Sequence, residues 1–282
     1  MKKGLVLEGG ALRGLFSAGV IDVMMEQGLE PDGLVGVSAG AAFGCNYKSR
    51  QPGRCIRYNK QFAHDKRYCS LTSFLKTGDL FGGEFCYHTL PTQLDLFDTH
   101  TFDTNPMDFY AVCTDVETGQ AEYRKLQEHG YECYEWIRAS ASMPLVSRIV
   151  SLNGRKMLDG GLADSIPLQF FQSKGYDRNI VVLTQPKGYI KTPNKLMPLI
   201  KWKYRRYPKF VEACANRHLM YNQELEYVAS EEQSGHALVI RPTAKLSIEH
   251  ISHNPDEMQQ VYEHGREIAL SHLNEIKNFW RQ

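Results

Sequence analysis

Apolar residues in this chain form short runs that alternate with helical patterns. Residues 4–8 form such a run, which ends at a pair of glycines, and a helical apolar pattern follows over 15–24. A second run, residues 34–37, leads through Ser38 into another helical pattern. A strand, a helix and a second strand in this order predict a βαβ unit, which places parallel strands in one sheet with helices on its faces.

The same alternation continues to the end of the chain. Asn153-Gly154 lies between the runs 146–150 and 156–158, which predicts a hairpin with a type I′ turn. Further strands are predicted at 108–114, 121–124, 179–184 and 237–241, and helices at 53–65, 84–95, 134–142, 167–174, 208–233 and 255–278. We therefore expect one three-layer α/β/α domain with a mainly parallel central sheet over residues 1–282. Its chemistry-bearing core is expected at about 4–184, and further strands and helices at 185–282.

Charge argues against a nucleic-acid partner. The 33 Lys and Arg residues nearly balance the 32 Asp and Glu residues, so the formal net charge is only +1. Any contact with a membrane must therefore be peripheral and local. One basic and aromatic cluster could bind lipid headgroups: Lys201, Lys203, Arg205, Arg206 and Lys209 with Trp202, Tyr204 and Tyr207. Clusters of this kind are more often an ordinary solvated surface.

Cysteine usage and hydropathy favour a cytoplasmic protein. The seven cysteines are odd in number and show no C-x-x-C spacing, so we expect reduced thiols and no zinc site. Glu8 and Arg13 interrupt the only N-terminal stretch that resembles a secretion signal. No apolar run reaches the roughly 18 residues that a transmembrane helix needs.

The first motif with chemical meaning is Gly36-Val-Ser38-Ala-Gly40, which fits the G-x-S-x-G nucleophile elbow. In this elbow a sharp turn from strand to helix exposes the serine hydroxyl, and glycines are needed because side chains at Gly36 and Gly40 would collide with nearby backbone. The pentapeptide alone is also compatible with an ordinary small-residue turn. Its position after an apolar run and before a helix favours the elbow.

A second glycine-rich loop, Gly9-Gly10-Ala11-Leu-Arg13-Gly14, follows the neighbouring predicted strand. In a parallel sheet this loop lies beside Ser38, where backbone N–H groups of Gly10 and Ala11 could form an oxyanion hole and Arg13 could help to hold the loop. Nucleotide-binding loops fit worse. Ala11 replaces the middle glycine of G-x-G-x-x-G, and Leu15-Phe16 stand where a phosphate loop needs Lys and Ser or Thr.

Two kinds of residue could serve as the base for Ser38. Asp159 precedes Gly160-Gly161, whose backbone freedom could bring a carboxylate close to the serine, although an aspartate here could also be a helix cap. A histidine of a Ser-acid-His triad is the alternative, because chain order permits several: His218, His236, His250, His253, His264 and His272. The early position of Ser38, after one βα unit, argues against the α/β-hydrolase fold that such a triad would suggest.

The order of these motifs resembles that of bacterial patatin-like phospholipases. The glycine loop at 9–14, the elbow at 36–40 and Asp159-Gly160-Gly161 carry the resemblance, and the segments 138–144 and 164–167 add to it. Ala11 replaces a third glycine found in some relatives, and Glu8 replaces an Asp of plant members. The similarity covers roughly residues 4–184 and implies a patatin-like fold with a Ser38/Asp159 dyad, a glycine-rich oxyanion loop and no catalytic histidine.

The expected activity is hydrolysis of an acyl ester of a lipid, through an acyl-enzyme on Ser38 and without a metal or organic cofactor. The same residues would make an acyltransferase if an alcohol or thiol outcompeted water. From another class, a catalytically idle lipid-binding or interaction module would keep the fold without the reaction. A lid over the site, if present, is expected in 65–106 or 186–210.

Overall fold

A central sheet of eight strands organises the computed structural model, which describes residues 1–281. The strands are β1 (Lys2–Leu7), β2 (Gly33–Val37), β3 (Asp108–Asp115), β4 (Ala121–Lys125), β5 (Val150–Leu152), β6 (Arg155–Asp159), β7 (Tyr176–Val182) and β8 (Ala237–Ile240). Their order is β5-β6-β3-β2-β1-β7-β8, and β4 pairs with β3. The run β3-β2-β1-β7-β8 is parallel throughout, whereas β4, β5 and β6 pair in antiparallel fashion.

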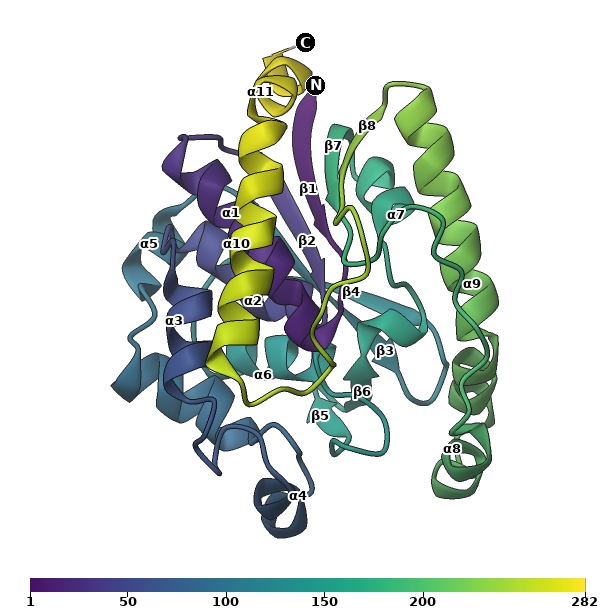
Figure 1. Ribbon diagram of the computed structural model, residues 1–282. Helices are drawn as coiled ribbons and strands as arrows, with labels where there is room; N and C mark the ends of the chain where they lie inside the picture. The colour runs from purple at the N-terminus through teal and green to yellow at the C-terminus, as the bar shows by residue number, and fades with distance from the viewer. Residues whose placement is uncertain (282) are drawn as a thin grey trace.

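Helices cover both faces of this sheet (Figure 1). Helices α1 (Gly14–Glu26), α2 (Ala39–Lys48), α3 (Arg54–Gln61), α6 (Tyr131–Ser140) and α10 (Pro255–Ser271) form one layer, and α7 (Leu168–Ser173) and α9 (Pro208–Gln233) form the other. Further helices are α4 (Leu71–Thr77), α5 (Thr99–Thr104), α8 (Met197–Lys203) and α11 (Leu273–Arg281). In addition, η2 (Phe85–Leu94) is a π-helix, and η1 (Ala11–Arg13) and η3 (Gly160–Leu162) are short 3-10 turns. The predicted three-layer α/β/α class with a mainly parallel sheet is confirmed.

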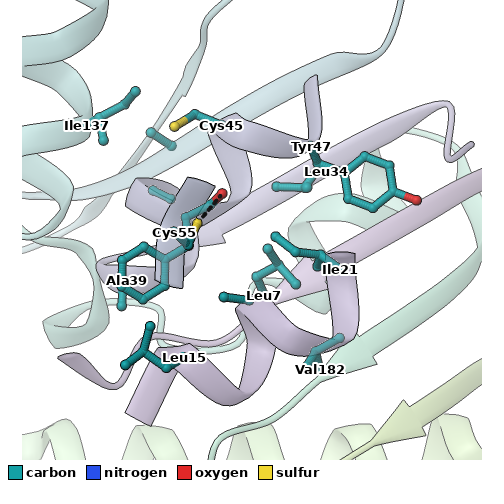
Figure 2. Close-up of a cluster of buried hydrophobic side chains, with 14 of the residues drawn as sticks. Leu7, Leu15, Ile21, Leu34, Ala39, Cys45, Tyr47, Cys55, Ile137 and Val182 are labelled. Carbon is teal, nitrogen blue, oxygen red and sulfur yellow. Dashed lines mark hydrogen bonds between the residues drawn. The ribbon is translucent and has the colours of Figure 1, made fainter. Parts of the chain in front are cut away.

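Alternating side chains of β1 supply two separate apolar cores. Leu5 and Leu7 point to the face covered by α1 and α2, and Val6 points to the face covered by α7 and α9. Figure 2 shows part of the first core, where Leu7, Leu15 and Leu34 pack together. Because the central strands are buried on both faces, they appear in the sequence as continuous apolar runs.

Two glycines let α1 and α10 cross at very short range. A Cβ atom on Gly19 would lie 2.1 Å from the carbonyl oxygen of Tyr262, and one on Gly265 would lie 2.0 Å from that of Phe16. No side chain fits at either position without moving a helix. The C-terminal helix α10 is thereby fixed against the first helix of the chain.

Several predicted boundaries were wrong. The first hairpin strand lies at Val150–Leu152 instead of 146–150, because Pro144 and the positive φ of Leu145 (72°) keep the preceding residues irregular. The helix predicted over 255–278 is two helices that break at His272. The short helices α4, α5 and α8 were not predicted, since they are too short to show apolar periodicity. The type I′ turn is confirmed by positive φ at Asn153 (51°) and Gly154 (75°).

The helices and the cysteines of the structure can be compared with the expected absence of membrane spans and the expected reduced thiols. Over residues 1–281 no helix combines the length and apolar character needed to cross a membrane. All seven cysteines are free thiols, and six of them are buried.

Candidate active site

Strands β2 and β6 meet head to head beside β3. Strand β2 pairs with β3 as far as Val37 opposite Val112, and β6 pairs with the next residue of β3, since Asp159 lies opposite Cys113. Strand β4 occupies the other edge of β3 along this stretch, so β2 and β6 must share one edge. Because β2 and β6 run in opposite directions, their carboxyl ends face each other there. The chain leaves β2 at Ser38 and β6 at Asp159.

The turn that carries Ser38 is strained and tightly packed. Ser38 has φ 55° and ψ −120°, a conformation that costs a non-glycine residue of order 1–3 kcal/mol. A Cβ atom on Gly36 would lie 2.4 Å from the carbonyl oxygen of Gly40, and one on Gly40 would lie 2.4 Å from that of Leu7. Both glycines thus serve close backbone approach, and φ is not positive at either. The turn lifts Ser38 onto the N-terminus of α2.

The end of α6 holds both halves of the site. The backbone N–H of Ser38 donates to the hydroxyl of Ser140 at 2.9 Å, and the N–H of Asp159 donates to the carbonyl of Ser142 at 2.8 Å. Ser140 is fully buried. A single segment therefore sets the distance between the serine turn and the aspartate.

Asp159 is buried, and its carboxylate has few partners. One carboxylate oxygen accepts the N–H of Gly161 at 2.9 Å. Burial raises the pKa of Asp159 above the ordinary value of 3.8, whereas the nearby charge of Arg217 and hydrogen bonds from the Ser38 side chain and the Gly161 backbone lower it. The Ser38 hydroxyl thus lies close enough to act on the ionisation of Asp159. The next residue, Gly160, is in close contact with β3, where a Cβ atom would lie 2.1 Å from the carbonyl oxygen of Val112.

The glycine-rich loop packs directly on Ser38. A Cβ atom on Gly9 would lie 2.9 Å from the Cβ of Ser38, and one on Gly14 would lie 2.8 Å from that of Ala39. Ala11, the first residue of the turn η1, holds a left-handed φ of 49°. The backbone N–H groups of Gly10 and Ala11 donate to no group within residues 1–281. They remain free to bind an external acceptor.

Hydrogen bonds of Glu8 and Thr184 hold this loop in place. The Thr184 N–H donates to Glu8 Oε2 at 2.6 Å, and its hydroxyl donates to the carbonyl of Gly9 at 3.1 Å. The other Glu8 oxygen accepts the hydroxyl of Tyr221, on α9, at 2.6 Å. The buried carboxylate of Glu8 therefore joins the ends of β1 and β7 to α9.

Ser38 lies where an apolar and a polar cavity meet. Both cavities are lined by Ser38, Ala11 and Met143. The apolar cavity extends between η1, α2, α3, η2 and α6 and is lined largely by side chains such as Leu12, Phe43, Tyr58, Leu90, Tyr134 and Ile137. The polar cavity contains Asp159 and the glycine loop. The serine hydroxyl can thus face an apolar chain on one side and a polar group on the other.

Four basic residues line the polar cavity: Arg13, Lys191, Arg217 and His250. Sequence reasoning placed Arg13 in the glycine-rich loop and named His250 among the possible bases, but it did not place Lys191 or Arg217 at the site. Arg13 Nη1 lies 3.0 Å from His250 Nε2, and since arginine only donates, this nitrogen of His250 is the acceptor. Arg217 Nε donates to the carbonyl of Gly161 at 2.6 Å. No motif could have revealed Lys191 or Arg217, because they lie far from the glycine loops in sequence.

Among the histidines that chain order allowed as bases, only His250 lines the cavities at Ser38. The others bond elsewhere: His218 to the Ala215 carbonyl, His236 to Glu231, His253 to the Ala63 carbonyl, His264 to Glu267 and His272 to Glu275. Within residues 1–281, no three His, Cys, Asp or Glu side chains are grouped as they would be around a metal ion.

Comparison with known proteins gives two family matches. A family model described as patatin-like phospholipase matches residues 5–171, and one described as a domain of unknown function, DUF6363, matches residues 207–281. The first covers more than half of the chain, which therefore belongs to the patatin-like phospholipase family. The resemblance inferred from the motifs is confirmed at the level of the family.

Individual relatives are more distant. The chain is 30% identical over 207 residues to the uncharacterized protein YjjU of Escherichia coli, an alignment that covers 70% of this chain and 56% of YjjU. It is 26% identical over 179 residues to the lysophospholipase nte1 of Aspergillus niger, which covers 62% of this chain and 11% of that protein. The chain thus spans about half of one relative and a tenth of the other. Among solved structures, VipD from Legionella pneumophila matches with a TM-score of 0.48 and 12% identity, over 97% of this chain and 67% of VipD.

Proposed function

We propose that the protein hydrolyses acyl esters of lipids with Ser38 as the nucleophile and Asp159 as its base. The observation that carries this proposal is the meeting of β2 and β6, which brings the serine and the aspartate together at the junction of the two cavities. Family membership supports a lipid substrate, and the name of the fungal relatives suggests a lysophospholipid.

In the first half of the reaction, Ser38 Oγ attacks the ester carbonyl and its proton passes to Asp159. Negative charge develops on the carbonyl oxygen, which the N–H groups of Gly10 and Ala11 stabilise. A donor of this kind contributes about 3 kcal/mol to the transition state. The C–O bond of the ester then breaks, and Asp159 returns the proton to the leaving alcohol.

In the second half of the reaction, a water molecule enters the position that the alcohol has left and hydrolyses the acyl-enzyme. Asp159 takes a proton from water as the water attacks the acyl-enzyme, and the proton returns to Ser38 Oγ when the fatty acid leaves. Burial suits Asp159 for both steps, because the raised pKa of its carboxyl makes it a better proton acceptor than an exposed aspartate. No step requires a metal or an organic cofactor.

The test is steady-state hydrolysis of p-nitrophenyl esters of increasing chain length and of a lysophospholipid. We expect turnover by the wild-type protein and a loss of at least about a thousandfold in Ser38→Ala and in Asp159→Asn, since each variant removes a group that acts in the chemical step. Wild-type protein that binds these esters without turning them over would favour the idle binding module. Chain-length preference would report the depth of the apolar cavity.

Helix α8 supports a peripheral membrane contact, which we also propose. Leu196, Leu199 and Trp202 are 55%, 48% and 67% exposed, and they share this segment with exposed Lys201 and Lys203. Ile200 anchors the helix in a small apolar core that also contains Leu158 and Phe210, and it lines the polar cavity. Apolar and cationic side chains side by side suit the surface of an anionic bilayer.

Co-sedimentation with vesicles tests this contact. We expect the protein to sediment with vesicles that contain phosphatidylserine, and Trp202→Ser to weaken the association. Equal sedimentation of wild type and variant would contradict a role for α8. The cytoplasmic location expected from the free thiols is part of the same proposal, and fractionation of cells would test it.

A further inference from the structure

Three basic side chains gather in the polar cavity without a salt-bridge partner among the described residues. Arg13, Lys191 and Arg217 all line it, and none of them forms a salt bridge with any residue of the described chain. The Nε atom of Arg13 is buried and has no hydrogen-bond partner among these residues. Clustered cations of this kind repel one another, so the fold carries an electrostatic cost that an anion would relieve.

The ionisation of the basic groups reflects this repulsion. Burial and the charges of Arg217 and Arg13 lower the pKa of Lys191 to about 8. Burial and the charges of Arg13, Lys191 and Arg217 likewise lower the pKa of His250, so that it is neutral at physiological pH. An anion placed among them would favour the charged forms, so its affinity should increase as pH falls.

The two carboxylates that line the cavity form no salt bridge with these cations, although Glu8 partly offsets the lowering of the pKa of Lys191 and Arg217 lowers the pKa of Asp159. Both oxygens of Glu8 accept hydrogen bonds, one from the Thr184 N–H and the other from the Tyr221 hydroxyl. Asp159 is directed to Gly161 and Ser38. The cavity therefore offers net positive charge to a ligand.

Lys191 is held in place by α9. The Asn222 side chain bonds to both polar groups of the Lys191 backbone, accepting its N–H at 2.8 Å and donating to its carbonyl at 3.1 Å. The Lys191 ammonium lies 4.3 Å from the ring centroid of Tyr221 and 5.9 Å from that of Tyr189. These aromatic faces stabilise the charge and leave its hydrogen-bond donors available.

We propose that Arg13, Lys191 and Arg217 form a cationic subsite that binds a phosphate on the leaving group, so that the protein cleaves phosphorylated acyl esters in preference to neutral ones. This inference rests on the proposed function. With the ester carbon at Ser38, the acyl chain occupies the apolar cavity, and the alcohol that leaves lies in the polar cavity with its phosphate among the cations. Arginine and lysine donors match phosphate oxygens in number and geometry.

The proposal also gives a role to the C-terminal part of the chain. Arg217, Tyr221 and His250 all belong to residues 207–281, which match the family of unknown function, and Asn222 of the same region positions Lys191. This region thus supplies the recognition of the phosphate, while the patatin-like region supplies the reacting groups.

The test compares two lipids that differ only in the phosphate: monooleoylglycerol and lysophosphatidic acid with the same oleoyl chain. We expect wild-type protein to prefer the phosphorylated lipid, and Lys191→Met to lower kcat/KM for it by about tenfold or more, mainly through KM, since the lost contact is a charge-assisted hydrogen bond. The value for monooleoylglycerol should fall much less, so that the ratio of kcat/KM between the two lipids drops. Lys191→Arg keeps the charge and should retain the preference.

Lys195→Met is the matched control, because Lys195 lies on the same segment, is exposed and does not line the cavity. It should leave both lipids unaffected. Equal loss on both lipids in Lys191→Met, or no preference in the wild type, would overturn the proposal while leaving the hydrolase intact. Failure of the wild type to cleave any ester would instead contradict the proposed function. In that case, calorimetric binding of the two lipids to Ser38→Ala would still decide the phosphate site.

A free phosphate is the other source of the same chemistry. Inorganic phosphate added to the monooleoylglycerol assay distinguishes the two. If phosphate alone changes hydrolysis of the neutral lipid through Lys191, and the two lipids are cleaved equally well, the site takes a free ion and the assignment to the substrate headgroup is wrong. Weak competition against lysophosphatidic acid alone, lost in Lys191→Met, supports the headgroup.

Discussion

The proposed nucleophile Ser38, with φ 55°, and Ala11 of the glycine-rich loop, with φ 49°, adopt left-handed backbone conformations although neither is a glycine. Each costs free energy that the surrounding contacts must offset. For Ser38 the offset includes the hydrogen bond from its backbone N–H to Ser140 and the capped start of α2, where the N–H groups of Ala41 and Ala42 donate to its carbonyl.

The hydroxyl of Ser140 should therefore act as a positioning group. Ser140→Ala leaves the buried N–H of Ser38 without an acceptor, which costs about 1–3 kcal/mol, and lets the serine turn shift. We expect kcat for a p-nitrophenyl ester to fall by about tenfold, which corresponds to roughly 1.4 kcal/mol of the barrier, with KM nearly unchanged.

Ser142→Ala is the control for this prediction. The hydroxyl of Ser142 donates only to the carbonyl of Arg138, and its backbone carbonyl, which holds Asp159, is kept in the variant. We expect it to retain most of the activity. Similar losses of kcat in the two variants would show that the hydroxyl of Ser140 has no special role.

Burial of Asp159 predicts the direction of the pH dependence. Its pKa is raised, so the carboxyl holds its proton at pH values where an exposed aspartate has lost it. The protonated form cannot act as a base, so activity should be lost as pH falls through a value above 3.8. The acid limb of kcat/KM for an uncharged ester measures this directly, and a limb at or below pH 3.8 would contradict the assignment.

Among the residues of the site, those that belong to sequence motifs could be predicted, and those outside any motif could not. Glycine patterns mark Ser38 and Asp159, because tight turns need residues without side chains. Lys191 and Arg217 reach the polar cavity from a long loop and from the middle of α9. Only the tertiary structure brings them to the serine, and no local pattern records this.

At the scale of elements, the site depends on how strands and helices end and cross. The parallel neighbours β1 and β2 follow from the βαβ pattern, which is why the glycine loop was expected beside Ser38. The meeting of β2 and β6 does not follow from any pattern, because nothing local indicates that a hairpin strand pairs with the last residues of β3. The long helix α9 and the short helix α7 were predicted closely, whereas the short helices α4, α5 and α8 were not.

The crossing of α1 and α10 gives a prediction about stability. In Gly265→Ala the new Cβ would lie 2.0 Å from the carbonyl oxygen of Phe16, so the two helices must separate. We expect the free energy of unfolding to fall by about 1–3 kcal/mol, the usual cost of overpacking. Alanine favours an isolated helix over glycine by about 1 kcal/mol, so a loss would identify the crossing as its cause.

Urea unfolding monitored by circular dichroism measures this change. Ser271→Ala, at an exposed position of the same helix, should alter the free energy of unfolding by less than about 0.5 kcal/mol. If Gly265→Ala were as stable as wild type, the close approach of α1 and α10 would be wrong.

At the scale of the whole molecule, the two regions with separate family matches share one sheet. Strand β8 of the C-terminal region pairs with β7, and Tyr221 of the same region bonds to Glu8 at the end of β1. We propose that residues 1–282 fold as one unit, as the alternation of strands and helices suggested. The termini lie at the same end of the molecule, where α11 packs near β7 (Figure 1).

Tryptophan fluorescence can test this unity. Trp136 lies on α6 in the patatin-like region, and Trp280 lies on α11 in the C-terminal region. With Trp202 replaced by Phe, variants that keep only one of these two tryptophans should unfold at the same urea concentration, because a single cooperative unit has one transition. Separate midpoints would show two domains of different stability.

The central claim is that Ser38 is a nucleophile activated by Asp159, and intact-protein mass spectrometry after reaction with a fluorophosphonate tests it most directly. Such a probe forms a stable covalent bond with an activated serine. We predict one adduct per chain, located by peptide mapping on Ser38, absent in Ser38→Ala and formed far more slowly in Asp159→Asn. An adduct on another serine, no adduct on the wild-type protein, or equal labelling rates in wild type and Asp159→Asn would contradict the account.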